Sequence, residues 1–516
     1  MTISRLLDSN RDSRTAYPLK DALVSVASSG PNSKQRRFYI RRADCDLESV
    51  RNPGYLERDP SVECSTLTVP SRRLRRFLVL NEMASDTRPH KPRRIARIQI
   101  IAVSTLSITG VINYIDRGSL AIANTTIRTD LGISATRMGI LLSIFSLSYA
   151  FSQLPMGFLL DRLGERLVLG AGMFLWSLTQ TATGLVTSFS SFVGARVGLA
   201  VGESPFVVSA VKAVNDWFDV RDRATPMGIV NASTTLGQAI APPLLTITML
   251  AFGWRGMFVL IGIPGLILSI AWFAFYRERA DVTSNGSELT DLAASGRGDN
   301  LSRISFSQWQ RLFRKRTVWG LMLGFGGINY TVWLYMSWMP NYFEAEHHIS
   351  IAKTGVIAVI PFSCGAVGML LSGIIADSLV RSGIPPIRVH KTLLIIGMTC
   401  SAACTLLVPY APGATGAATA IGMALFFTYL AGNSGWGLVQ SIAPREIVGS
   451  VATIQNFGSF VCASFAPVIT GWLLDRTHSF HLTLAICSIM SILGALSYLL
   501  IVKDQSLSLN GDGFFR

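Results

Sequence analysis

The chain has 516 residues, of which 49% are hydrophobic and only 15% are charged, and its mean hydropathy is +0.41. Soluble domains carry roughly 25% charged residues, so the composition excludes an ordinary soluble enzyme of two or three domains. About 20 consecutive apolar residues span a bilayer, and the composition therefore indicates a polytopic membrane protein. The net charge is +15. Basic residues gather in the cytoplasmic loops of membrane proteins and account for such a charge, so no nucleic-acid partner is expected.

Residues 1–82 differ from the rest of the chain. They hold 15 basic and 10 acidic residues without a sustained apolar period, which predicts a disordered N-terminal extension, and they contain no secretory signal. Met83 begins a short basic tail, residues 83–97, that leads directly into the first apolar segment. We therefore interpret Met83 as the natural start and residues 1–82 as a translated upstream stretch.

Apolar segments of spanning length follow one another from residue 98. They predict an all-α membrane protein with twelve transmembrane helices in two halves, 98–276 and 317–503, separated by a polar middle loop, 277–316, and followed by a tail, 504–516. The predicted helices are 98–123, 136–160, 166–187, 189–213, 225–250, 254–276, 317–343, 351–379, 391–410, 412–438, 448–475 and 480–502.

The basic residues predict the orientation of these helices. With a cytoplasmic amino terminus, about 23 Lys and Arg residues fall on the cytoplasmic side against about 5 on the other side. This positive-inside bias predicts that both termini and the middle loop are cytoplasmic. Because organelle signals are lacking, the inner (plasma) membrane of a bacterium is the expected location.

The two halves repeat each other. The turn after the second segment contains Asp161 and the turn after the eighth contains Asp377, and in 231–242 and 456–467 a Pro follows an Asn by eleven residues. A duplicated six-helix arrangement predicts a central site between the halves.

The motif Gly-x-x-x-Asp-Arg-x-Gly-x-Arg at 157–166, with a weaker copy at 373–381, resembles the cytoplasmic loop motif of the major facilitator superfamily. In that superfamily the charged residues of the motif hold inter-helix contacts of the outward-facing state. The resemblance therefore implies conformational latches; the alternative is ordinary charged helix ends. The residues concerned are Asp161, Arg162, Arg166 and Asp377.

Two further strings, Ile-Asn-Tyr-Ile-Asp-Arg at 112–117 and Ala-Arg-Val-Gly-Leu-Ala-Val-Gly-Glu-Ser-Pro at 195–205, resemble the anion:cation symporters. Together with segments at 176–177, 216–218 and 253–255, they resemble the branch that contains hexuronate, glucarate and galactonate transporters. The likeness covers roughly residues 98–503. It implies a proton-coupled symporter that imports an organic anion by alternating access, without a cofactor.

Four charged residues stand within the predicted spans: Asp116, Arg117, Arg196 and Glu203. A charge in a span costs several kcal/mol unless it faces a cavity or a partner, so each is a functional candidate. Asp116 and Arg117 point about 100° apart on a helix, whereas Arg196 and Glu203 are two turns apart and share one face. The alternative interpretation is two structural ion pairs.

Arg117 is the leading candidate for the substrate anion, because a guanidinium offers a forked donor pair that matches a carboxylate. Tyr114, one turn away, adds a hydroxyl donor. Asp116 and Glu203, with Arg196 beside them, are predicted to couple protons, because burial raises and a nearby arginine lowers the pKa of a carboxyl. The resemblance assigns the same roles.

Polar residues on other segments are candidates to complete a site for a polyol. Trp436 offers an aromatic face that suits the apolar side of a sugar acid. For each of these residues, helix packing is the alternative. The candidates are Tyr149, Gln153, Asn433, Trp436 and Asn456. Galactonate transporters have a glutamine at the position of Thr234, which leaves the identity of the anion open.

An aromatic cluster in the seventh segment comprises Tyr330, Trp333, Tyr335 and Trp338, and Pro340 follows it. Such a helix could bend at its outer end and gate a cavity. The alternative is an aromatic belt at the membrane interface. Lys212, near the end of the fourth segment, is expected to extend its ammonium to the membrane surface.

The leading hypothesis is a symporter for a sugar acid such as a hexuronate, an aldonate or glucarate. A transporter of aromatic carboxylates stays open as an alternative, and a membrane sensor is disfavoured because the C-terminal tail is too short for an output domain. An enzyme or an ATP-driven pump is disfavoured because neither catalytic groups nor a nucleotide loop occur. The seven cysteines lack partners at metal-ligand spacing. The expected partners are a small organic anion, protons and the bilayer, with the protein a monomer.

Overall fold

The computed structural model describes residues 24–26, 38–40, 93–218, 222–278, 311–444, 447–504 and 507. The chain divides into two units, Met1–Lys91 and Pro92–Arg516. In the first unit, β1 (Val24–Val26) pairs antiparallel with β2 (Phe38–Ile40). The proposed start at Met83, most of the middle loop and most of the C-terminal tail lie outside the described residues.

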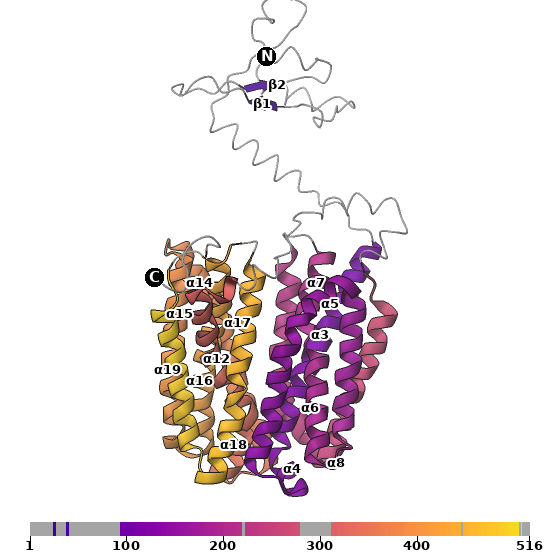
Figure 1. Cartoon of the computed structure of the whole chain (residues 1–516), viewed down its shortest axis with the longest axis vertical. Helices are drawn as coiled ribbons and strands as arrows, with labels where there is room; N and C mark the ends of the chain where they lie inside the picture. The colour runs from indigo at the N-terminus through magenta and orange to yellow at the C-terminus, as the bar shows by residue number, and fades with distance from the viewer. Residues whose placement is uncertain are drawn as a thin grey trace, which may run out of the picture. The chain divides into compact units, whose positions relative to one another are not determined.

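The second unit is helical from Arg93 onward (Figure 1). The N-terminal half consists of α3 (Arg93–Ile122), α4 (Asn124–Leu131), α5 (Ala135–Thr183), α6 (Phe189–Glu203), α7 (Phe206–Trp217) and α8 (Ala224–Phe275). The C-terminal half consists of α12 (Arg316–His347), α13 (Ile351–Ile357), α14 (Val359–Arg381), α15 (Pro386–Leu407), the short η7 (Val408–Tyr410), α16 (Gly413–Ile442), α17 (Val448–Ala463), α18 (Phe465–Thr477) and α19 (His481–Leu500). The two halves stand side by side in Figure 1.

Within the described residues, nine helices or consecutive helix pairs are long and apolar enough to cross a membrane. One of them, Thr225–Phe275, has 51 residues, which at 1.5 Å per residue is about 76 Å and more than twice the thickness of a bilayer core. The chain reverses within it at Gly253 (φ 71°), as it does within α5 at Gly164 (φ 77°). Because glycine adopts a positive φ without strain, α5 and α8 each comprise two helices joined at a glycine.

The turn at Gly253 is tied to the end of α4. The Trp254 indole donates a hydrogen bond of 3.1 Å to Asp130, and the Arg255 guanidinium donates one of 2.5 Å. These two donors hold the pKa of the Asp130 carboxyl below its usual range. The Gly-Trp-Arg string at 253–255 is therefore a structural element of one face of the bundle.

Glycine allows close helix packing within each half. α5 packs along α6, and α3 along α8. A Cβ on Gly172 would lie 2.7 Å from the carbonyl oxygen of Gly202, and one on Gly202 would lie 2.5 Å from the backbone nitrogen of Trp176. Membrane helices associate through such small residues because lipid provides no hydrophobic driving force between them.

All four members of the aromatic cluster on α12 are buried: Tyr330, Trp333, Tyr335 and Trp338. The Trp338 indole donates to the carbonyl of Pro467 on α18 at 3.2 Å. Burial between helices excludes the interpretation as a membrane-interface belt, because the rings of such a belt face lipid headgroups.

The two halves meet closely at the face of the bundle opposite to the one at which α3 begins. We call it the turn face, because it carries the turns at 123–134, 253 and 478–480. Asp475 of α18 accepts hydrogen bonds from the backbone nitrogens of Ala135 and Thr136 at 2.9 and 2.7 Å and from the Thr136 hydroxyl at 2.6 Å. Thr125 donates to Glu344 at 2.6 Å. The C-terminal half thus caps the first turn of α5.

We expect Asp475→Ala to weaken this closure. The first backbone N–H groups of a helix need acceptors, and a cap is worth about 0.5–2 kcal/mol. Such a loss changes the population of the closed form up to about 30-fold. Double electron–electron resonance between spin labels at Thr129 and His478, with the native cysteines replaced, measures the distance between the two halves at this face. We expect longer distances for Asp475→Ala and a smaller change for Asp475→Asn, which keeps one acceptor. Unchanged distances for Asp475→Ala would contradict the capping role.

Candidate functional site

The four charged residues of the predicted spans are buried together in the N-terminal half. Asp116 and Glu203 are 0% exposed, Arg196 is 3% exposed, and the Arg117 side chain is 6% exposed. α3 supplies Asp116 and Arg117, and α6 supplies the other two. With all four groups ionised, the cluster has no net charge. We call it the charged quartet.

Arg117 is the partner of Glu203. Its Nε donates to the carboxylate oxygen Oε2 of Glu203 at 2.8 Å. The sequence spacing placed Arg196 on the same face of α6 as Glu203, but the ion pair found is the one that joins α3 to α6. The candidate anion-binding group is therefore held by one of the candidate proton carriers.

Three aromatic rings surround the Arg117 guanidinium. Its carbon Cζ lies 4.9 Å from the ring centres of Tyr114 and Tyr149 and 5.5 Å from that of Phe145. An aromatic face attracts a cation through its quadrupole, more strongly where water is excluded. The rings therefore stabilise the positive charge of Arg117 while leaving Glu203 as its anionic partner.

Several polar atoms of the charged quartet lack a hydrogen bond of ordinary geometry within the described part of the chain. They include both carboxylate oxygens of Asp116, Oε1 of Glu203, and Nε and one Nη of Arg196. Arg196 and Arg117 lie near enough to attract the charge of Asp116, and Glu203 lies near enough to repel it. Most buried polar atoms in proteins have partners, so these atoms are suited to exchange a proton or to bind a ligand.

The rings around Arg117 extend to the C-terminal half. Tyr149 lies 4.8 Å from Phe460 of α17, and Phe145 lies 5.7 Å from Trp333 of α12, between ring centres. Trp333 and Phe460 lie 6.0 Å apart. The charged quartet therefore borders the interface between the two halves, where the internal repeat predicts a central site.

Two predicted site residues meet across this interface. Asn456 donates from Nδ2 to Oε1 of Gln153 at 2.8 Å. Gln153 is one turn from Tyr149 on α5, and Asn456 is one turn from Phe460 on α17, so this bond lies next to the aromatic contact on the side of the α3 start. Asn433 and Trp436 lie elsewhere: Trp436 is 38% exposed and packs on Phe325 at 5.2 Å, and Asn433 lies near Gly373. Both contacts are within the C-terminal half.

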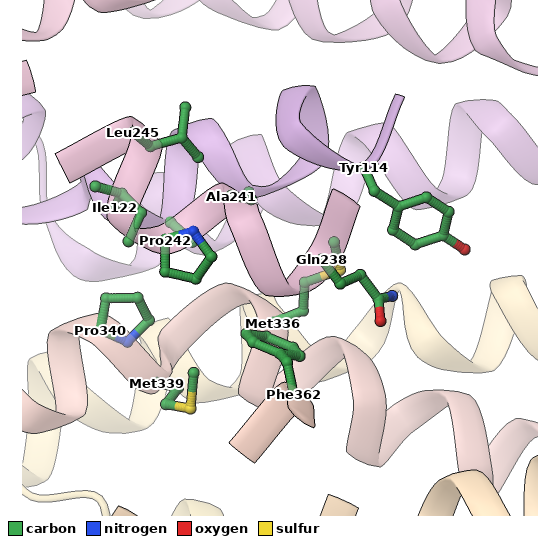
Figure 2. A pocket seen from close by; sticks show the side chains of 12 residues that line it. Tyr114, Ile122, Gln238, Ala241, Pro242, Leu245, Met336, Met339, Pro340 and Phe362 are labelled. Atoms are coloured by element: carbon green, nitrogen blue, oxygen red, sulfur yellow. The ribbon is translucent and has the colours of Figure 1, made fainter. Parts of the chain in front are cut away.

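Another bond between the halves, near the site, involves two residues that were not predicted. Tyr429 of α16 donates from its hydroxyl to Oε1 of Gln238 on α8 at 2.8 Å. Gln238 and Tyr114 line the same pocket, and Figure 2 shows both polar side chains toward one end of it. A glutamine within an apolar span is costly by the same argument as a charge, and this signal could have identified Gln238.

The predicted latch residues make contacts within their own halves. Arg162 is exposed and lies over the ring of Phe158 at 4.2 Å. Arg166 donates from Nη2 to the carbonyl of Phe273 at 2.7 Å, and the carbonyl of Asp377 accepts a bond of 3.2 Å from Arg381. The side chain of Asp161 is outside the described structure.

Lys212 lies on α7, and its side chain is 32% exposed. Its ammonium contacts Glu165 and, at 3.0 Å, Asp216, and Glu165 also accepts a bond of 2.9 Å from the Tyr276 hydroxyl. Glu165 is fully buried. Lys212 therefore neutralises a buried carboxylate of the loop motif.

Among the described residues, no group of three or more His, Cys, Asp and Glu side chains could hold a metal ion. The cysteines of the described region are free: Cys364, Cys400, Cys404, Cys462 and Cys487.

Comparisons with known proteins agree with this architecture. The family model described as Major Facilitator Superfamily matches residues 106–467. The chain is 49% identical over 411 residues to the "Probable L-galactonate transporter" of Escherichia coli (strain K12), covering 80% of this chain and 91% of that one. It is 31% identical over 405 residues to the "Hexuronate transporter" of Bacillus subtilis (strain 168), covering 77% and 93%.

A solved structure with the same fold is that of a bacterial homologue of the human lysosomal transporter Spinster, in an inward-facing and unoccupied conformation. It has a TM-score of 0.66 and 17% sequence identity, and the match covers 79% of this chain and 98% of that one. The family match spans well over half of the chain, so the family resemblance and the expectation of a non-enzymatic membrane protein are confirmed. The chain belongs to the major facilitator superfamily, a family of membrane transporters.

Proposed function

We propose that the chain is a proton-coupled symporter that imports a sugar acid by alternating access. The two relatives are named for sugar acids, L-galactonate and hexuronate. The observation that carries the proposal is the buried ion pair of Arg117 and Glu203 at the interface between the halves. It joins a group suited to bind a carboxylate with a group suited to carry a proton.

The coupling follows from the charge of the site. The charged quartet is neutral when all four members are ionised, so an added carboxylate would leave one uncompensated negative charge in a buried site. Such a charge is strongly destabilising. Protonation of Glu203 removes the excess charge and releases Arg117 to form its forked pair with the substrate. Asp116, beside Arg196, is the second proton-coupling candidate.

The remaining predicted residues complete the site in this proposal. Tyr114, Tyr149 and the amides of Gln153 and Asn456 bind hydroxyl groups of the substrate. The bond between these two amides pairs the donor of Asn456 with the acceptor of Gln153, and substrate hydroxyls can replace it. Asn433 and Trp436 bind the substrate from the C-terminal half after the halves move relative to each other.

We further propose twelve membrane passes, cytoplasmic termini, an inner-membrane location and a functional monomer. The reversals at Gly164 and Gly253 support twelve passes, because they divide α5 and α8 into two passes each. The positive-inside bias supports the orientation. The turn face is then the outer face, and Asp475 caps α5 when that face is closed. Asp161, Arg162, Arg166 and Asp377 act as latches when the outer face opens and the cytoplasmic face closes.

Uptake into proteoliposomes tests the proposed function. The full chain is reconstituted, and labelled L-galactonate or D-glucuronate is supplied outside, with and without an alkaline interior. We expect accumulation above equilibrium that depends on the pH gradient and disappears with a protonophore. Accumulation that does not depend on the pH gradient would contradict proton coupling. Uptake of benzoates in place of sugar acids would favour the alternative of an aromatic-carboxylate transporter.

A further inference from the structure

The bond between Gln238 and Tyr429 lies beside the candidate anion site, on a different pair of helices from the bond between Gln153 and Asn456. Gln238 is buried. The Tyr429 ring packs against α14, where a Cβ on Gly365 would lie 2.6 Å from the ring carbon Cδ2. Both members are thus held in place by their surroundings.

Tyr114 connects this bond to Arg117. Its ring lies 4.9 Å from the Arg117 guanidinium, and its side chain lines the same pocket as Gln238. A Cβ on Gly237, the residue before Gln238, would lie 3.1 Å from the Cβ of Tyr114. A substrate whose carboxylate binds Arg117 therefore has Tyr114, Gln238 and Tyr429 within the same region for the rest of its carbon chain.

The pocket beyond Gln238 and Tyr114 is uncharged. The residues that line it otherwise are apolar, and Figure 2 shows their side chains around the cavity. They include Met336, Met339 and Phe362 from the C-terminal half, and Ile122 and Leu245 from the N-terminal half. A second carboxylate at this end would have neutral partners and apolar walls without a compensating cation, which is a costly environment for a buried charge.

We propose that Gln238 and Tyr429 form the neutral end of the substrate site. They bind hydroxyl groups at the end of the substrate remote from the carboxylate, and they select polyhydroxy monocarboxylates over dicarboxylates of the same length. This inference rests on the proposed function. The phenol and the amide bond to each other, and a substrate hydroxyl, both donor and acceptor, can take the place of either partner. A substrate that separates the two groups without supplying that hydroxyl leaves both of them unpaired.

Binding of three ligands to the full-length protein in detergent tests the proposal. The ligands are galactonate, its 6-deoxy analogue, and galactarate, which has a second carboxylate in place of the terminal hydroxymethyl group. Titration calorimetry gives Kd without a need for transport. For the unaltered protein we expect galactonate to bind at least about tenfold more tightly than either other ligand, the effect of one hydrogen bond lost in a buried site.

Two variants separate a hydroxyl contact from a structural role. Tyr429→Phe should weaken galactonate binding about tenfold and change the Kd of 6-deoxygalactonate by less than a factor of two, so that the preference disappears. Gln238→Lys adds a cation to the neutral end and should reverse the preference in favour of galactarate. Tyr410→Phe, the same change at a tyrosine that is 78% exposed, should leave all three Kd values unchanged.

The outcomes distinguish this inference from the proposed function. Two results would contradict the neutral end and leave the proposed sugar-acid transport unaffected. One is equal binding of galactonate and galactarate to the unaltered protein. The other is that Tyr429→Phe weakens the binding of galactonate and of 6-deoxygalactonate by the same factor. If Tyr429→Phe does not fold, an unchanged preference in Gln238→Lys overturns the inference by itself. If no sugar acid binds or is transported, the proposed function fails and this inference fails with it.

Discussion

Arg117→Lys is expected to reduce the initial rate of sugar-acid uptake by about 10- to 100-fold at equal amounts of folded protein. Lysine keeps the charge, but its compact ammonium cannot form the two parallel bonds that a guanidinium makes with a carboxylate. Hydrogen bonds to charged groups are worth about 1.5–3 kcal/mol, which corresponds to this range of rates. The substitution also removes the planar group that lies against Tyr114 and Tyr149 at 4.9 Å. Proteoliposome uptake with quantified protein measures the effect.

Arg137→Lys is the matched control for this prediction. Arg137 also lies over an aromatic ring, that of Phe189 at 5.7 Å, but it is exposed near the turn face. Its replacement should leave uptake within about a factor of two, as surface changes usually do. Should Arg117→Lys transport as well as this control, the forked pairing is not what Arg117 provides.

The sequence predicted much of the fold because charge and hydropathy dictate it locally. The gap between predicted helices 136–160 and 166–187 contains Gly164, and the gap between 225–250 and 254–276 contains Gly253. Both residues are the points of chain reversal. The loop motif at 157–166 and the Gly-Trp-Arg string at 253–255 are local signals of a turn. A reversal therefore needs no knowledge of the neighbouring helices.

The pairing within the site could not be predicted in the same way. Burial of Arg117 and Glu203 followed from the cost of a charge in a span, but the two residues are 86 positions apart, and their contact depends on how α3 packs against α6. Spacing along one helix instead indicated Arg196 as the neighbour of Glu203. The pairing of Lys212 with Glu165 was not predicted for the same reason, because the two residues come from different helices.

Gln238 and Tyr429 show a second limit of prediction from the sequence, which concerns contacts between the two halves. Each is one polar residue in an apolar segment, and each segment alone accounts for it as helix packing. Only the hydrogen bond of 2.8 Å across the two halves identifies them as a pair. Cross-half contacts depend on the assembly of both halves, so single-segment patterns contain no information about them.

Glu203→Gln is expected to abolish uptake driven by a proton gradient while counterflow persists. The amide mimics the protonated acid, so the variant cannot release the proton that return of the empty carrier requires. In counterflow the loaded carrier exchanges labelled for unlabelled substrate and keeps its proton. With Glu203 neutral, the empty charged quartet has one excess positive charge, which favours an anion, and binding should be retained or tightened. Paired measurements in proteoliposomes, gradient-driven uptake and counterflow, separate the two activities.

Glu165→Gln serves as the control, because Glu165 is an equally buried carboxylate that is neutralised by Lys212 and bound by Tyr276 outside the site. Its loss should lower the stability of the protein yet leave the ratio of gradient-driven uptake to counterflow unchanged. The coupling role fails if Glu203→Gln keeps normal gradient-driven uptake, or if a folded Glu203→Gln protein loses counterflow together with uptake. The second result would mean that Glu203 holds Arg117 in place for structural reasons, because an amide accepts a weaker bond from a guanidinium than a carboxylate does.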